Sequence, residues 1–302
     1  MTNEFSRKFG LARSLVITLG VLIGLSGRSA TAGPLEEAAD AYRRGDYVSE
    51  LRLLRLAADK GDAPAAFMLG QQYELGQGVQ RDSAEADRWY QKAAEAGYAP
   101  AQYTLGTAFE TGHGVARDYV SAVAWYRRAA DQGWSAAQYN LGVAYENGNG
   151  VPQDFAAAVD WYRKAANETA GHAQGNLAFK YPSQGVLSSL VRANAESNLG
   201  VAYDKGRGVA QDYATAASFF SKAAAEGNVA AQYSLAGHFE LGLGVPKDPV
   251  RAYTWFSLAA MHLPISDMAL RPKAIAGRDR VAATMSREQI TEAEKRAKDW
   301  KP

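Results

Sequence analysis

The sequence predicts an all-α fold, a helix–turn–helix solenoid built from repeated helix pairs. Three observations carry this prediction. A motif with two glycines recurs five times at spacings of 36, 36, 58 and 36, the 36-residue stretches around it align without gaps, and each stretch holds two helix-like segments. The copies are GQGVQRD, GHGVARD, GNGVPQD, GRGVAQD and GLGVPKD, and their first glycines are Gly76, Gly112, Gly148, Gly206 and Gly242.

The segment before each motif is the first helix of a pair, helix A. In the third copy it runs from about Ala137 to Glu146. Gly142 lies inside this helix, where glycine costs about 1 kcal/mol relative to alanine. The same glycine recurs as Gly70, Gly106 and Gly200, which indicates that two helix backbones approach closely there; the fifth copy has Ala236.

An acidic residue ends helix A in every copy: Glu74, Glu110, Glu146, Asp204 and Glu240. A side chain needed in every repeat usually serves packing or capping. We therefore expect it to bond loop amides within its own repeat rather than to form a stripe that attracts cationic partners.

The segment after each motif is helix B. Its N-cap residue is an aspartate in every copy, namely Asp82, Asp118, Asp154, Asp212 and Asp248. Asp82 and Glu85 fit a capping box, and Pro249 stands at a first helical position. An aromatic pair and an alanine pair follow, as in WYRKAA, and we expect both pairs to pack in the core rather than to form a carbohydrate platform. Left-handed glycines then end three of these helices, at Gly97, Gly133 and Gly227.

The repeats divide the chain. Five copies occupy 65–100, 101–136, 137–172, 195–230 and 231–266. Residues 173–194 interrupt the period, since Pro182 ends a beginning helix A and the glycine turn, the aspartate cap and the aromatic pair are missing. Two interpretations stay open here: a decayed repeat spanned by a short irregular helix, or a hinge or specificity element.

The first 32 residues have the pattern of a secretory signal peptide. A basic start is followed by the apolar run 14–25 and by small residues at Ala30 and Ala32. Twelve apolar residues rise about 18 Å as a helix, short of the roughly 30 Å hydrocarbon core, so cleavage after about Ala32 is favoured over a membrane anchor. The general secretory route is preferred because Lys8 replaces the second arginine of a twin-arginine signal. We expect export, most simply to a periplasm, and no stable membrane insertion after cleavage.

Charge and cysteine content exclude several functions. Without residues 1–32 the chain keeps 29 basic and 31 acidic residues, a net charge near −2, so no strong field for nucleic acid remains. The chain has no cysteine, which excludes disulfides, a cysteine nucleophile and thiolate metal sites.

No pattern of catalytic or metal-binding residues stands out. His238 with Glu240 lacks the H-E-x-x-H spacing and a further ligand cluster, and His113 occupies a position filled elsewhere by leucine or arginine. Neither a G-x-S-x-G elbow nor an S-x-x-K motif is present. The Gly-x-Gly motif, in five equivalent copies, is a turn rather than a phosphate or calcium loop. We expect no cofactor, no metal and no enzymatic activity.

Taken together, the recurring residues resemble the Sel-one-like repeat family, relatives of the tetratricopeptide repeat. The resemblance covers about 65–266 and follows the pattern A-x-x-x-L-G-x-x-Y-x-x-G-x-G-V-x-x-D-x-x-x-A-x-x-W-Y-x-K-A-A. Residues 33–64 resemble the helix pair that often opens such arrays, and 267–302 the capping helices that close them, with a capping box at Ser286 and Gln289. The resemblance implies a right-handed α/α superhelical solenoid that binds proteins or peptides.

By the same resemblance, variable helix A positions face a concave groove. These are Tyr103, Tyr139, Asn140, Gln138, Asn198 and Tyr233. Tyrosine and amide side chains suit peptide recognition. The expected function is that of an exported, non-catalytic adaptor or regulator in the cell envelope. Two alternatives stay open: a penicillin-binding or β-lactamase-like hydrolase, the label of some cysteine-rich relatives, and a self-assembling scaffold. The oligomeric state and the partner stay open too.

Overall fold

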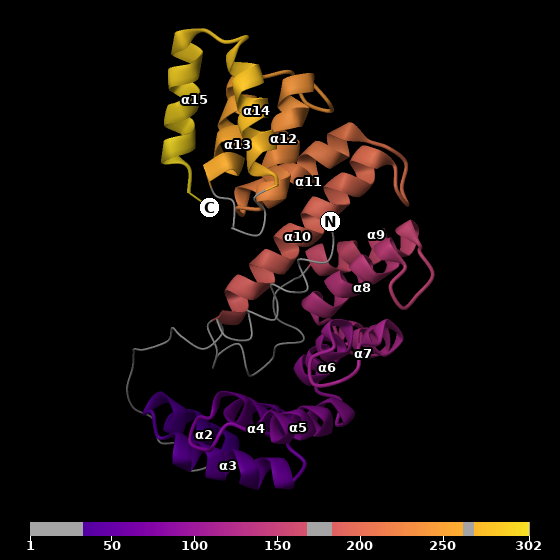
Figure 1. Cartoon of the computed structure of the whole chain (residues 1–302), viewed down its shortest axis with the longest axis vertical. Coiled ribbons are helices and arrows are strands. Elements are labelled where there is room, and N and C mark those ends of the chain that lie inside the picture. The colour runs from indigo at the N-terminus through magenta and orange to yellow at the C-terminus, as the bar shows by residue number, and fades with distance from the viewer. Residues whose placement is uncertain (1–32, 168–182, 262–268, 302) are drawn as a thin grey trace. The chain divides into compact units, whose positions relative to one another are not determined.

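The computed structural model describes residues 33–167, 183–261 and 269–301, and these ranges contain helices and no strand. Figure 1 shows the helices along the chain. Their bounds are α2 Pro34–Arg43, α3 Tyr47–Asp59, α4 Ala63–Leu75, α5 Ser83–Glu95, α6 Ala99–Thr111, α7 Tyr119–Asp131, α8 Ser135–Asn147, α9 Phe155–Ala166, α10 Ser183–Lys205, α11 Tyr213–Ala225, α12 Val229–Leu241, α13 Pro249–Met261, α14 Arg271–Ala282 and α15 Arg287–Asp299. The predicted all-α class is confirmed. The signal-peptide pattern, residues 168–182, His172 and His262 lie outside the described residues.

The chain forms two compact units. Of the described residues, the first comprises 33–153 and 183–186, and the second 154–167, 187–261 and 269–301. Within the first unit each helix from α2 to α8 packs against the next one in sequence. Within the second unit α11, α12 and α13 pack in the same serial way, and α13 also contacts α14 and α15, which close the array.

Helix ends follow the predicted capping chemistry. The carboxylate of Asp118 accepts hydrogen bonds from the amides of Val120 and Ser121, and the other four predicted aspartates make equivalent bonds. Gly97, Gly133 and Gly227 have positive φ, as predicted. Ser286 and Gln289 form the predicted reciprocal capping box.

One predicted cap is wrong. Asp82 caps α5, but Glu85 does not complete a capping box with it. The carboxylate of Glu85 instead accepts hydrogen bonds from Trp89 Nε1 and from Arg88, both at 3.0 Å. The Glu85 carboxylate therefore bonds to the half-buried tryptophan one turn along the helix and not to the backbone N–H of Asp82.

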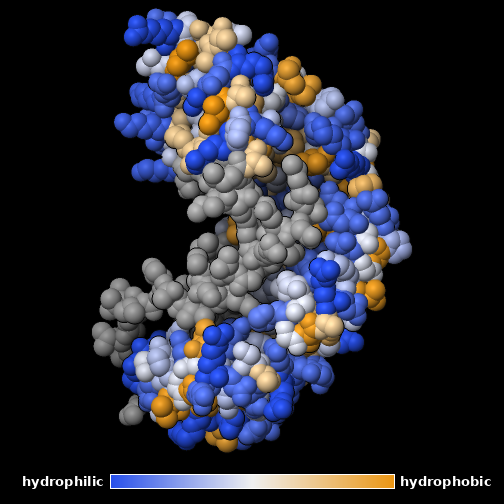
Figure 2. All heavy atoms as spheres, in the orientation of Figure 1, coloured by the Kyte–Doolittle hydropathy of each residue, from blue (hydrophilic) through white to orange (hydrophobic). Residues whose placement is uncertain are grey.

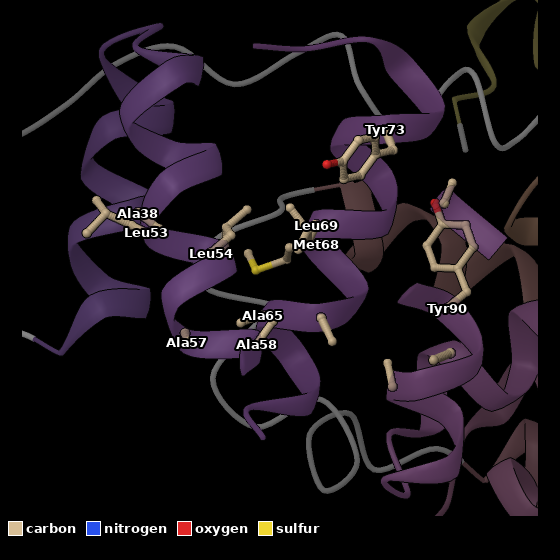
Figure 3. Packing of buried hydrophobic residues seen from close by; sticks show 14 of the residues in the cluster. Ala38, Leu53, Leu54, Ala57, Ala58, Ala65, Met68, Leu69, Tyr73 and Tyr90 are labelled. Atoms are coloured by element: carbon tan, nitrogen blue, oxygen red, sulfur yellow. The ribbon is translucent and has the colours of Figure 1, made fainter. Parts of the chain in front are cut away.

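The N-terminal core shows how the helix pairs stack. Leu54 of α3 and Leu69 of α4 are fully buried, and Met68 lies between them in Figure 3. Ala57 and Ala58 lie where α3 meets α4, and these small residues let the two helices approach. Tyr73 and Tyr90 carry the same cluster on toward α5. Each pair thus buries its apolar face against the next pair.

The second half of the interrupted segment is a regular helix. Residues 183–194 are continuous with the fourth helix A, so that α10 has 23 residues where α12 has 13. An irregular helix over this part is therefore wrong. The hinge and specificity interpretations stay predictions, because residues 168–182 lie outside the described ranges.

The visible surface is mainly hydrophilic. On the face that Figure 2 shows, hydrophobic residues are scattered over both units among polar ones. Val48, Val120 and Leu241 are the most exposed large apolar side chains of the described residues. Such single exposures are normal for a soluble surface.

Candidate functional site

The acid at the end of helix A binds the tyrosine of helix B. The hydroxyl of Tyr90 donates to Glu74 Oε2 at 2.6 Å, and that of Tyr126 donates to Glu110 Oε2 at 2.5 Å. The prediction that the acid is structural is supported here, and the tyrosine hydroxyl is a partner that was not predicted; bonding to a loop amide stays a prediction. A buried hydroxyl needs an acceptor, and the carboxylate provides one inside the repeat.

We expect Tyr126→Phe to lower the free energy of unfolding by about 1 kcal/mol, because the ring still fills its site while Glu110 loses its donor. Urea unfolding followed by circular dichroism measures this change. Glu110→Gln keeps an acceptor oxygen for the hydroxyl and should cost less. An unchanged midpoint for Tyr126→Phe would contradict a stabilising role of the bond.

The recurring glycine of helix A makes room for the same aromatic ring. A Cβ on Gly106 would lie 2.5 Å from the ring of Tyr126, and one on Gly200 would lie 2.5 Å from the ring of Phe220. The ring is therefore the nearest neighbour of these glycines. At Gly70 a Cβ would also lie 3.1 Å from the backbone oxygen of Ala86, so the predicted close approach of two helix backbones is supported there. In the fifth repeat the ring of Phe256 lies against Gly277 of α14, and Ala236 fits at the glycine position.

The Gly-x-Gly turn fixes the spacing between neighbouring repeats. Both glycines have positive φ, for example 72° at Gly148 and 73° at Gly150. A Cβ on Gly150 would lie 2.2 Å from the carbonyl oxygen of Tyr119, in the first turn of the preceding helix B. Gly208 and Gly244 meet Phe155 and Tyr213 in the same way. The turn docks onto the previous repeat, and this contact gives the second glycine a role beyond the predicted chain reversal.

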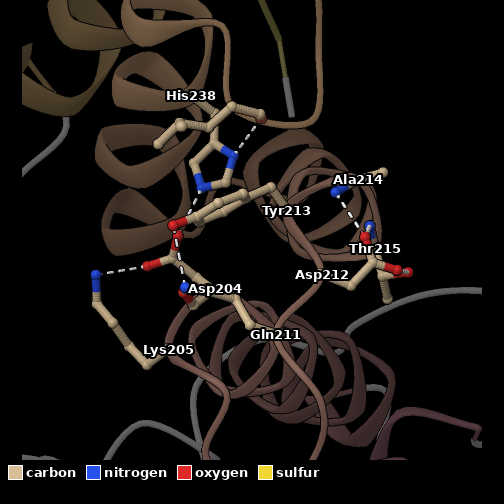
Figure 4. A network of polar contacts seen from close by, with 9 residues as sticks. Asp204, Lys205, Gln211, Asp212, Tyr213, Ala214, Thr215 and His238 are labelled. Carbon is tan, nitrogen blue, oxygen red and sulfur yellow. Dashed lines mark hydrogen bonds and ion pairs between the residues drawn. The ribbon is translucent and has the colours of Figure 1, made fainter.

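Two repeats carry phenylalanine in place of the tyrosine, and their acids find other partners. Asp204, in the repeat of Phe220, lies 3.2 Å from Nε2 of His238 and 2.7 Å from Nζ of Lys205 (Figure 4). Glu240, in the repeat of Phe256, accepts two hydrogen bonds from Arg280. The histidine and the arginine thus replace the missing hydroxyl.

His238 has the surroundings of a structural histidine. It is buried, with its ring edge-on to Phe220, and its Nδ1 lies 2.8 Å from the carbonyl oxygen of Leu243. With Nε2 3.2 Å from Asp204, both ring nitrogens contact groups of the protein itself. His113 is exposed in its turn. The described residues contain no group of three or more His, Asp or Glu side chains that could hold a metal ion.

The two aromatic residues of helix B differ in burial in the first two repeats, whereas in the third Trp161 and Tyr162 are both buried, as predicted. Tyr90 and Tyr126 are buried, as predicted for core residues. Trp89 and Trp125 are only half-buried, and Lys92 and Arg128 of the same helices lie over their rings at 4.6 and 4.4 Å. These basic side chains cover the exposed ring faces that a sugar would need.

The structure brings three of the predicted partner-binding residues together. Tyr103 of α6 packs against Tyr126 and Trp134, and burial raises the pKa of its hydroxyl. Asn140 of α8 lies beside that hydroxyl and interacts with it, and Tyr139 is close enough to affect its ionisation. Tyr139 is 6% exposed, whereas Tyr103 and Asn140 are half-buried.

The other three predicted residues lie in separate repeats. Gln138 uses its amide to donate to the carbonyl oxygen of Ala130 at 3.2 Å, the bond that Gln232 makes to Ala224. Tyr233 is half-buried against Phe256, and Asn198 is half-buried on α10. The partner-binding role of all six residues stays a prediction.

Sequence reasoning missed a recurring link between repeats. An arginine of helix B donates to the tyrosine hydroxyl near the end of the next helix A, from Arg55 to Tyr73 and from Arg127 to Tyr145. Arg163 makes the same bond to Tyr203 at 2.8 Å. The signal was present in the numbering: the first two pairs are 18 residues apart, and the third is 40 apart because 22 residues interrupt the period.

With this geometry in view, the family assignment is direct. The family model of the Sel1 repeat matches residues 63–98, 99–134, 135–169, 193–228 and 229–262. The chain belongs to the Sel1 repeat family, whose members are generally helical repeat scaffolds for protein interaction without catalytic activity of their own.

Solved structures agree with this assignment. A Sel1 repeat protein from Oxalobacter formigenes is 28% identical with a TM-score of 0.67, and the match covers 88% of this chain and all of that one. The protective antigen c5321 of uropathogenic Escherichia coli, which displays an SLR fold, is 30% identical with a TM-score of 0.54. That match covers 87% of this chain but 59% of c5321. A search of the curated proteins gave no match. No helix of the described residues is both long and apolar enough to cross a bilayer.

Proposed function

We propose that this chain is an exported, non-catalytic adaptor that binds a protein or peptide in the cell envelope through its helix A residues. The main support is that the recurring residues of the motif make contacts within the protein itself. The tyrosine, the acid and the glycines of the repeat motif contact other helices of the array, and the aspartate caps its own helix. The residues left to vary between repeats are those that can distinguish a partner.

Export and a periplasmic location rest on the pattern of residues 1–32: a basic start, an apolar run of twelve residues and a small-residue cleavage site. Detecting the mature chain, beginning at about residue 33, in a periplasmic fraction tests this part. Full-length protein retained in the membrane fraction would contradict it.

The amide residues are the better probes of partner binding. Alanine at Tyr103 or Tyr139 would remove packing as well as any contact with a partner, because these rings are buried or half-buried. Asn140→Ala and Asn198→Ala remove little volume. The two changes together should reduce capture of the partner from an envelope extract by at least about tenfold, the loss of one or two good polar contacts.

A matched control makes this test specific. Arg88 of α5 is 78% exposed on helix B, so Arg88→Ala should leave capture unchanged. Circular dichroism shows whether each variant keeps its helices. Equal capture by the double asparagine variant and the wild type would reject the helix A surface.

The hydrolase alternative has no observation in its favour among the described residues. A fluorescent penicillin tests it directly, since an acylating serine would form a covalent adduct. The self-assembly alternative is tested by the molar mass of the purified chain in solution. We expect no adduct, and no growth of the particle mass with concentration.

A further inference from the structure

Two buried polar residues stand in the N-terminal helix pairs where the next two repeats carry alanine; the contact between the fourth and fifth repeats has Ala216 with His238 at these positions. Glu50 of α3 and Gln72 of α4 are 22 residues apart. At the equivalent positions the next helices have Ala86 with Ala108, and then Ala122 with Ala144. A change from alanine to a long polar side chain on both sides of one contact indicates that the two residues act as a pair.

The pair lies within the core. Glu50 is 1% exposed and Gln72 4% exposed, and Leu54, one turn after Glu50, is fully buried in the cluster of Figure 3. Gln72 Nε2 donates to Glu50 Oε1 at 2.9 Å. The remaining oxygens, Glu50 Oε2 and Gln72 Oε1, are buried and have no donor.

A single proton on Glu50 would provide the hydrogen-bond donor that these two oxygens lack. Both oxygens of a carboxylate can only accept hydrogen bonds, and the same holds for the carbonyl oxygen of a carboxamide. When Glu50 is charged, Glu50 Oε2 and Gln72 Oε1 therefore have no donor. A neutral carboxylic acid carries one O–H donor. Its hydroxyl can donate to Gln72 Oε1 while Gln72 Nε2 donates back, so that both orphaned oxygens are satisfied.

We propose that a protonated Glu50 and Gln72 form a reciprocally hydrogen-bonded acid–amide pair that docks α2 and α3 onto α4, and that loss of the proton loosens this terminal helix pair. The inference is independent of the proposed adaptor function. The ends of repeat arrays open more easily than their middle, so a polar pair at the first contact can control that opening.

Among the described residues, no basic side chain is found to act on the Glu50 carboxyl. Burial raises the pKa of Glu50 to about 8, against a smaller lowering by the Gln72 hydrogen bond. The titratable group that interacts with it is the hydroxyl of Tyr42. Tyr42 of α2 packs edge-on to Tyr47 of α3, and burial, Tyr47 and Glu50 together raise the pKa of Tyr42. Gln72 is the polar group that α4 contributes.

The direction of the pH effect follows from linkage. A glutamate in the unfolded chain has its ordinary pKa of 4.5, so between this value and about 8 the docked state binds a proton that the opened state has lost. Docking is therefore strongest at acidic pH, weakens as the pH rises through this window and levels off above it. The opening constant of α2 and α3 can rise by up to about tenfold per pH unit.

Hydrogen exchange and carbon NMR on the full chain test the proposal. The Glu50 carboxyl signal should report a protonated acid at pH 6 that titrates near pH 8. Protection factors of the α2 and α3 amides, corrected for intrinsic exchange, should fall by at least about tenfold between pH 5.5 and 7.5. Helices α6 and α7 should show no comparable loss.

Glu50→Gln keeps a neutral pair at every pH, since its amide can both donate to Gln72 and accept from it. We expect this variant to hold its α2 and α3 protection constant over the same window. Glu36→Gln removes an exposed acid of α2 and should retain the wild-type fall. An ionised Glu50 at pH 6, or the same fall in Glu50→Gln, would overturn the proposal. If Glu50→Gln does not fold, the titration of the Glu50 carboxyl in the wild-type chain is by itself sufficient to test the proposal.

Discussion

Replacing Gly150 with alanine is expected to lower the free energy of unfolding by about 3 kcal/mol, whereas replacing Gly148 should cost about 1 kcal/mol. Both glycines have the same positive φ, so the conformational cost is shared. The two substitutions differ in the atoms that the new methyl group would meet. A Cβ on Gly150 meets the backbone carbonyl of Tyr119 at 2.2 Å, while one on Gly148 meets Gln153 Cβ at 3.4 Å.

Urea unfolding of the two variants measures this difference. A backbone carbonyl in the first turn of α7 cannot move aside as a flexible side chain can, so the neighbouring repeat must shift. Equal destabilisation by the two substitutions would show that the turn only reverses the chain and does not set the distance between repeats.

Replacing Gly106 with alanine should cost about 1 to 2 kcal/mol, although alanine is the better helix former by about 1 kcal/mol. The new methyl group would lie 2.5 Å from the buried ring of Tyr126. Gly237 is the matched control, because it also lies inside a helix A but has open space around it. Gly237→Ala should therefore stabilise the chain by about 0.5 to 1 kcal/mol.

The two substitutions are expected to change the free energy of unfolding in opposite directions, so the comparison separates the effect of the ring contact from that of helix propensity. Thermal or urea unfolding gives both values. A stabilising Gly106→Ala would mean that the ring of Tyr126 can move away without loss, and that the recurring glycine has a purpose other than accommodating this ring.

Much of the local structure could be predicted from the sequence because the repeat samples it five times. The aspartate caps, the glycine helix ends and the buried second aromatic each follow from one residue's own chemistry and recur at a fixed spacing. The errors concern partners. Glu85 bonds to Trp89 rather than to the cap, and the bond from Tyr90 to Glu74 was not predicted.

Partners across helices depend on the rotation of one helix against another, which a periodic sequence does not specify. Arg55 and Tyr73 show that some of this information was nevertheless available, since their spacing recurs. The partner-binding role of the six helix A residues is a prediction that rests on family resemblance. Side-chain burial then separates them, since Tyr139 is buried while Asn140 and Asn198 are half-buried.

The most direct test is a hydrogen-exchange footprint of the chain in complex with the partner that it captures. If helix B and the glycine turns hold the repeats together while helix A binds, binding should increase protection mainly in α6, α8, α10 and α12, with little change in α5, α7 and α11. Protection concentrated in α5, α7 and α11 or in the turns, with α6, α8, α10 and α12 unchanged, would contradict this division of roles.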